Sequence, residues 1–136
     1  MAPAPKPVPV PSPESRPYWD ALKQHRLVMP RCTACSRHWF PPSLLCPYCN
    51  ARDFSWAEMS GRGRIFSYVV FHRVYHPGFA GEVPYVVGLI ELAEGPRMIS
   101  NVIGIPADRV ECDMAVRVVF EDREGATVPL FTPASS

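Results

Sequence analysis

The chain has 136 residues, 47% of them hydrophobic, and a formal net charge of +1. This length allows one domain, or one small domain together with a metal module. The near-neutral charge provides no general attraction to nucleic acids or anionic membranes. No stretch approaches the ~20 apolar residues of a membrane span, and the start lacks the unbroken apolar run of a signal peptide. We therefore expect a globular cytoplasmic protein that does not contact membranes.

Residues 1–14 carry proline at nearly every second position and predict an extended, disordered tail. A proline-rich ligand segment is the alternative. Residues 15–29 then predict an N-terminal helix, which Ser15 caps and which ends near Leu27. Two alternatives remain for its apolar stripe: it packs into the core of this chain, or it anchors a partner. The stripe consists of Tyr18, Trp19 and Leu22.

Residues 30–58 contain two C-x-x-C pairs, whose spacing indicates a structural zinc ribbon. Four thiolates close a tetrahedral shell without an open position, and iron is the alternative metal. Two disulfides would need an oxidising compartment, and a redox C-x-x-C occurs singly near a βαβ pattern that is absent here. The four predicted ligands are Cys32, Cys35, Cys46 and Cys49.

The segments beside the cysteine pairs predict the rest of the ribbon. Residues 27–31 read as a strand that enters the first pair, and residues 38–40 as its return strand. Asn50 follows the second pair, where a left-handed residue often closes the turn. Residues 54–59 are expected to lead away from the ribbon. The fifth cysteine, Cys112, is interpreted as a half-buried filler rather than a reactive thiol.

Residues 59–133 predict a mainly β domain of five short antiparallel strands. The crossover at 105–113 follows the third strand, as in the five-stranded OB-fold barrel, and a generic β-sandwich is the alternative. The expected strands are 64–75, 84–92, 97–104, 114–121 and 127–131.

The long connection at 72–84 borders the usual ligand face of an OB-fold. It predicts a shaped loop that contacts a ligand or partner. Catalysis by His72 or His76 is the alternative, but no nucleophile–histidine order, paired carboxylates or phosphate-binding glycine loop accompanies them. We therefore assign no catalytic residue. The candidate contacts for a ligand or partner are Arg73, Tyr75, His76 and Phe79, with Arg62 and Arg64 as further candidates for a phosphate.

The order of these sequence motifs resembles that of one known family. It runs from Tyr18-Trp19 through the two cysteine pairs, Ser60-Gly61-Arg62-Gly63, His76-Pro77 and residues 83–87 to residues 116–120. The chain is similar to the acyl-CoA-associated OB-fold proteins with a rubredoxin-like zinc ribbon, known as domain of unknown function 35. The proline-rich tail is longer than the family core.

The resemblance implies an N-terminal helix, a zinc ribbon and an OB barrel in a small accessory subunit of a thiolase-like enzyme. The catalytic residues would belong to the partner, which in this family is a thiolase, aldolase, acyltransferase or hydratase, some of them in steroid side-chain degradation. Acyl-CoA would be the ligand. The alternatives are a zinc-ribbon/OB-fold protein that binds nucleic acid and a free-standing enzyme.

Overall fold

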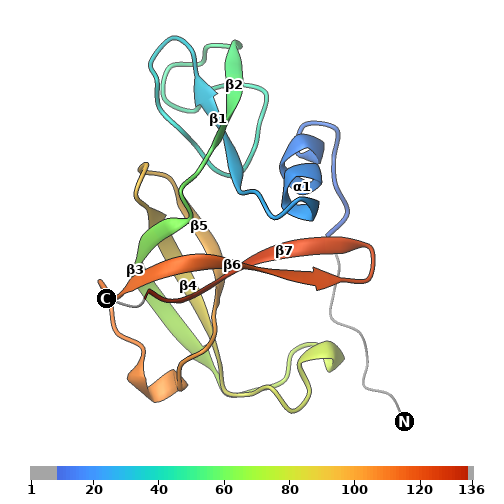
Figure 1. Ribbon diagram of the computed structural model, residues 1–136, viewed down its shortest axis with the longest axis vertical. Helices are drawn as coiled ribbons and strands as arrows, with labels where there is room; N and C mark the ends of the chain where they lie inside the picture. The colour runs from blue at the N-terminus through green and yellow to red at the C-terminus, as the bar shows by residue number, and fades with distance from the viewer. Residues whose placement is uncertain (1–8, 135–136) are drawn as a thin grey trace.

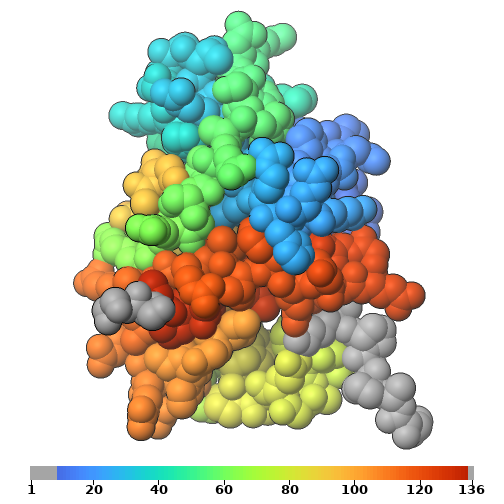
Figure 2. Space-filling model, viewed as in Figure 1, coloured from blue at the N-terminus to red at the C-terminus, as the bar shows by residue number. Residues whose placement is uncertain are grey.

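A computed structural model describes residues 9–134 and contains two β-sheet modules with one helix beside their junction (Figure 1). A two-stranded sheet forms the upper module, and a closed five-stranded barrel forms the lower one. The first eight residues of the predicted tail, 1–8, lie outside the described residues. The space-filling view shows the upper module and the helix stacked on the barrel (Figure 2).

Helix α1 (Arg16–Lys23) is shorter than the sequence predicts. His25 adopts φ +57°, and the N–H groups of His25 and Arg26 donate to the carbonyls of Leu22 and Ala21. This is a Schellman termination, so the predicted end near Leu27 is wrong. The predicted cap is also wrong in detail, because the Ser15 hydroxyl makes no bond to the helix.

The apolar stripe of α1 faces the inside of the molecule, because the helix packs against β1 and β7. Tyr18 is 2% exposed and Leu22 is fully buried, whereas Trp19 is partly exposed. Burial raises the pKa of the Tyr18 hydroxyl. Of the two alternatives for this stripe, Tyr18 and Leu22 therefore show the first, because both pack into the core of this chain. Contact with a partner stays a prediction, and Trp19 is the residue of this stripe whose side chain is available for it.

The ribbon sheet consists of β1 (Val28–Cys32) and β2 (Phe54–Glu58), which pair antiparallel from Val28↔Glu58 to Cys32↔Phe54. The predicted return strand at residues 38–40 is wrong, since only an isolated bridge joins Arg31 and His38. Residues 54–59 do not lead away but supply the partner strand. Within the segment between the two cysteine pairs, Trp39 is buried beside the cysteines, whereas Leu44 is exposed.

The barrel confirms the OB-fold. Its strand order is β3-β4-β5-β7-β6, with a parallel contact between β5 and β7 and antiparallel pairing elsewhere. The short helix η2 (Ala107–Arg109) lies in the crossover after β5. Closure through the pairing of β3 with β6 excludes an open sandwich. The strands are β3 (Arg62–Phe71), β4 (Tyr85–Leu92), β5 (Arg97–Val102), β6 (Ala115–Arg123) and β7 (Ala126–Pro133).

One continuous hydrophobic core joins the three parts of the molecule. Leu22 of the helix and Met29 of the ribbon strand belong to the same buried cluster as Ile65, Ile90 and Phe131 of the barrel. Because these side chains exclude water together, burying them stabilises the arrangement of the helix and the ribbon on the barrel.

Candidate metal centre and ligand surface

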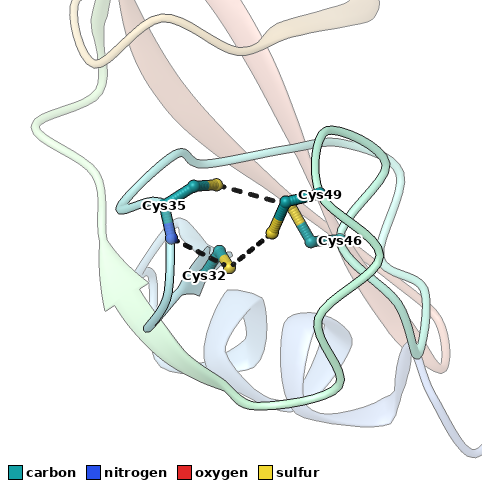
Figure 3. Close-up of side chains that lie close together, drawn as sticks. All are labelled: Cys32, Cys35, Cys46 and Cys49. Carbon is teal, nitrogen blue, oxygen red and sulfur yellow. Dashed lines mark hydrogen bonds between the residues drawn. The ribbon is translucent and has the colours of Figure 1, made fainter.

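The side chains of the four paired cysteines point toward one another (Figure 3). Their Sγ atoms all lie within 4.8 Å of one another. The Cys32–Cys49 and Cys35–Cys46 sulfur atoms are 3.5 and 3.6 Å apart, which is far longer than a disulfide bond of ~2.05 Å. An ion with Zn–S bonds of ~2.3 Å at the centre of a tetrahedron would hold its sulfurs ~3.8 Å apart. The cluster therefore fits a four-thiolate metal.

Two similar backbone turns hold these side chains. Ser36 and Asn50 each follow a cysteine pair, at φ +66° and +62°. Each donates its N–H to the carbonyl of the first cysteine of its pair, Cys32 or Cys46, over 2.9 Å. The predicted left-handed turn at Asn50 is confirmed. The equivalent turn at Ser36 was missed, because serine carries little preference for that conformation.

Backbone donors prepare the sulfurs for metal binding. The N–H groups of Cys35 and then Ala34 point at the Cys32 sulfur and lower the pKa of this thiol to about 6. The Ala51 N–H also favours the Cys49 thiolate, but the neighbouring sulfurs, Cys32 first, raise the pKa of Cys49 to about 12. A bound cation would remove this repulsion between neighbouring thiolates.

The ribbon has only a small core of its own. Its fully buried members are Cys32, Trp39 and Cys46. The Trp39 indole N–H donates to the Ser43 hydroxyl over 3.0 Å, and its ring packs edge-on against Phe54. Because two of the three buried residues are metal ligands, the stability of this module depends on the metal.

The connection between β3 and β4 forms an ordered aromatic loop at the opposite end of the barrel (Figure 1). It contains the short helix η1 (Pro77–Phe79), which His76 caps by accepting the Gly78 N–H on Nδ1 over 2.9 Å. Phe79 stacks on Tyr85 with ring centroids 4.9 Å apart. The His76 ring also makes an edge-on contact with the Phe79 ring. The capping bond gives His76 a structural role in this loop.

Two hollows border this loop and share Pro84, Ile105 and Ala107. One of about 340 Å³ lies between Phe79 and Tyr85 of the loop region and the crossover. The other, of about 600 Å³, includes His72. Both volumes fall in the range of small-molecule sites. Arg73 and Tyr75 belong to the loop but line neither hollow. The Tyr75 side chain is exposed, and the Arg73 guanidinium lies 5.8 Å from its ring centroid. The sequence missed the crossover side of these hollows, because only the barrel topology brings residues 105–107 opposite the loop.

Arg62 and Arg64 do not join this group. They lie at the start of β3, which at ~3.3 Å per residue is roughly 30 Å from the aromatic loop. Arg64 bonds Glu91 over 3.0 Å and also contacts Asp113. Hydrogen bonds from Arg97, and then from Arg64, lower the pKa of Glu91. The predicted ligand residues thus form two separate groups, one at each end of the barrel.

No helix within residues 9–134 is long and apolar enough to cross a membrane.

Comparison with known proteins identifies both modules. Residues 19–55 match the rubredoxin-like zinc ribbon domain of ChsH2, and residues 56–121 match its C-terminal OB-fold domain. A chain of the solved structure "Ltp2-ChsH2(DUF35) aldolase" superposes with a TM-score of 0.85 and 39% identity, covering 94% of this chain and 100% of that chain.

Two relatives are similar over most of this chain. A probable enoyl-CoA hydratase alpha subunit of Thermomonospora curvata is 42% identical over 86% of this chain, which spans only 36% of that relative's length. A DUF35 domain-containing scaffold protein of Methanocaldococcus jannaschii is 33% identical, covering 75% of this chain and 73% of the relative. The chain therefore belongs to the DUF35 family, with the zinc ribbon and the C-terminal OB-fold domain described for ChsH2.

Proposed function

We propose that this protein is a non-catalytic accessory subunit that binds acyl-CoA and a thiolase-like or aldolase enzyme subunit. The observation that carries the proposal is its likeness, over the full length of the matched chain, to a chain of an aldolase structure. The relative described as a scaffold protein supports a role without chemistry of its own. Catalytic groups would then belong to the larger partner in a hetero-oligomer.

The metal centre has a structural role in this proposal. Four cysteine ligands leave no open position at a tetrahedral ion for a substrate or an activated water. Zinc is the proposed metal, since it is the usual occupant of a ribbon of this kind. A reducing compartment such as the cytoplasm would keep all five thiols reduced.

The acyl-CoA contact is proposed at the aromatic loop. Phe79 lines the smaller hollow, whose walls are partly polar and include Asn101. The larger hollow beside it has mostly apolar walls, such as Val70 and Ile105, which suit the pantetheine and acyl portions of the ligand. Tyr75 and His76 belong to the same loop as Phe79. Arg73 offers a guanidinium for a phosphate. The apolar walls favour a long or steroid-like acyl group over a short polar one.

Calorimetric titration with acyl-CoAs of increasing chain length tests this contact. We expect binding to strengthen with chain length and F79A to weaken it about tenfold or more, because the variant loses an apolar wall. Y48A is the matched control, since Tyr48 is an exposed aromatic on the ribbon. Equal effects of F79A and Y48A, or no binding to the isolated chain or its enzyme complex, would contradict the acyl-CoA proposal.

The alternative, a nucleic-acid-binding zinc-ribbon/OB protein, has weaker support. Both modules bind nucleic acid in other contexts, but the net charge is only +1. A contact with several phosphates would lose affinity steeply with salt. A mobility-shift assay of single-stranded DNA and RNA at rising salt tests this alternative, and we expect no specific complex.

A further inference from the structure

The outer face of the sheet β3–β4–β5 is open to solvent, although many of its side chains are apolar. Val69 is 53% exposed and Ile99 is 69% exposed. Helix α1 packs against β7 and β1 and leaves these two side chains uncovered. A contiguous apolar area of this kind on a folded protein marks an interaction site.

The register of the ladder sorts the outward side chains into rows. Ser67, Leu89 and Ile99 are neighbours across the three strands, and Val69 lies beside Val87 in the next row. A β-bulge between Ile65 and Ser67 interrupts the pairing at Phe66, and the Phe66 side chain is exposed as a result. We name this surface the apolar strand face, defined by Phe66, Val69, Val87, Leu89 and Ile99.

The apolar strand face is shallow, and at its centre the Ser67 hydroxyl lies among aliphatic side chains. A hollow of about 280 Å³ lies over its middle rows. The side chains around it are mostly aliphatic, so it offers few hydrogen-bonding groups to a sugar or a nucleotide. A broad apolar centre is instead typical of the buried middle of a protein–protein interface.

Arginines border one end of the apolar strand face. Arg97 lies 3.8 Å above the ring centroid of Phe66 and bonds Glu91. Arg64 shares Glu91 and contacts Asp113. Beside them, Arg62 of β3 is the direct cross-strand partner of Arg117 of β6, and like charges in that position repel. Glu94 also lies beside Arg62, where its carboxylate accepts the Ser60 N–H. Four guanidinium groups against three carboxylates leave this border with one positive charge in excess.

The closed barrel limits how a partner can bind here. Strand β3 is hydrogen-bonded to β4 on one side and to β6 on the other, and β4 lies between β3 and β5. A partner therefore cannot add a strand beside β3 or β4. It must contact the outward side chains, with an apolar surface against the centre and negative charge against the arginine border.

We propose that the apolar strand face docks the catalytic acyl-CoA enzyme subunit, through an apolar patch on that subunit bordered by carboxylates. This inference rests on the proposed accessory function and assigns it a surface. The interface has an apolar middle and a charged rim, the arrangement that gives affinity in the centre and orientation at the edge.

Titration of the chain against the aldolase subunit of the similar solved complex tests this surface. I99E and V69E place a carboxylate in the apolar centre, and we expect each to weaken binding at least about tenfold. L44E is the matched control, because Leu44 of the ribbon is 67% exposed, nearly as much as Ile99. We expect a change below about threefold for L44E. Thermal melting and metal content confirm that all three variants fold.

The arginine border has its own variant. R97E should weaken the complex and also flatten its dependence on salt, because it removes one attractive charge pair. R52E, an exposed arginine of the ribbon, is the control and should leave the salt dependence unchanged.

The outcomes separate the two proposals. A complex that I99E and V69E leave intact would overturn the docking surface and leave the accessory function standing. If I99E and V69E lose acyl-CoA binding but still bind the enzyme subunit, the apolar strand face binds the ligand, and the inference is overturned. A dimer of the isolated chain that I99E dissociates would assign the face to a second copy. Failure of the wild-type chain to bind the aldolase would contradict both proposals.

Discussion

The cysteine side chains are aimed at a common point by the backbone turns that carry them. The turns at Ser36 and Asn50 repeat the same hydrogen bond and the same left-handed conformation. Each thiol is therefore positioned largely by local geometry, and a metal bound to all four thiolates would hold the two turns together.

Replacing one ligand should empty the centre. C46S removes a buried thiolate, and we expect the metal content to fall from about one ion per chain to a small fraction of that, with the ribbon melting first. Metal analysis and thermal melting measure this. C112S is the control, because Cys112 lies outside the cluster. Cys112 is exposed, so the prediction that it is half-buried is wrong. A C46S protein that keeps its metal and its melting curve would contradict the four-thiolate assignment.

A second prediction concerns the contact between the end of α1 and the barrel. His25 bonds Asp122 over 3.0 Å and stacks on Phe120. The His25 bond, and then Thr127, lower the pKa of Asp122. A depressed carboxyl pKa contributes stability that is present above the unfolded pKa of ~3.9 and is lost as pH falls through the folded value.

NMR titration of the Asp122 carboxyl group tests this contact. We expect H25A to move the pKa of Asp122 back toward its ordinary value, because the largest cause of the shift is gone. H72A, which changes a histidine of the aromatic loop, should leave it in place. An identical Asp122 titration in wild type and H25A would show that the ion pair is absent in solution.

At the scale of elements, α1 is held by the core and not by its own propensity, since it spans only eight residues. L22A should lower the free energy of unfolding by about 2–5 kcal/mol, as for other fully buried leucines. W19A should cost less, because Trp19 is partly exposed. Chemical denaturation measures both. The reverse order would mean that the helix packs on the barrel through its other side.

The turn between ribbon and barrel depends on Gly61. Its φ is +81°, and an added Cβ would lie 2.4 Å from Val118 Cγ1. G61A should therefore destabilise the protein by about 1–3 kcal/mol beyond the cost of the backbone conformation. G95A is the matched control, with φ +114° and nothing within 4 Å of the added Cβ. Equal unfolding midpoints for the two variants would contradict the close approach.

Helices and strands could be predicted where a pattern of a few neighbouring residues determines them. The cysteine spacing, the five barrel strands and the crossover follow from patterns of a few residues. The early end of α1 could not be predicted, because His25 occupies a position that glycine usually fills. The pairing of β1 with residues 54–58 was missed for another reason: it joins strands more than twenty residues apart, and the nearer residues 38–40 offered a more local partner.

At the scale of the whole molecule, the chain carries three separate surfaces. The ribbon with the cysteine cluster lies at one end and the connection between β3 and β4 lies at the other (Figure 1). The two hollows border that connection, and the apolar strand face runs from it along β3, β4 and β5 to the arginine border. Arg62 and Arg64 are grouped with Arg73 and Tyr75 as candidate contacts in the sequence analysis. The fold places the two pairs at opposite ends of the barrel, which could not be predicted from the sequence. An enzyme docked on the apolar strand face would adjoin the proposed acyl-CoA loop.

The most direct test of the accessory function is a pull-down of the tagged protein from its native cells, with mass spectrometry of the captured proteins. We expect one acyl-CoA enzyme of the thiolase or aldolase class in about stoichiometric amount, retained by wild type and lost with I99E. Recovery of RNA- or DNA-processing proteins without any acyl-CoA enzyme would contradict the account and favour the nucleic-acid alternative.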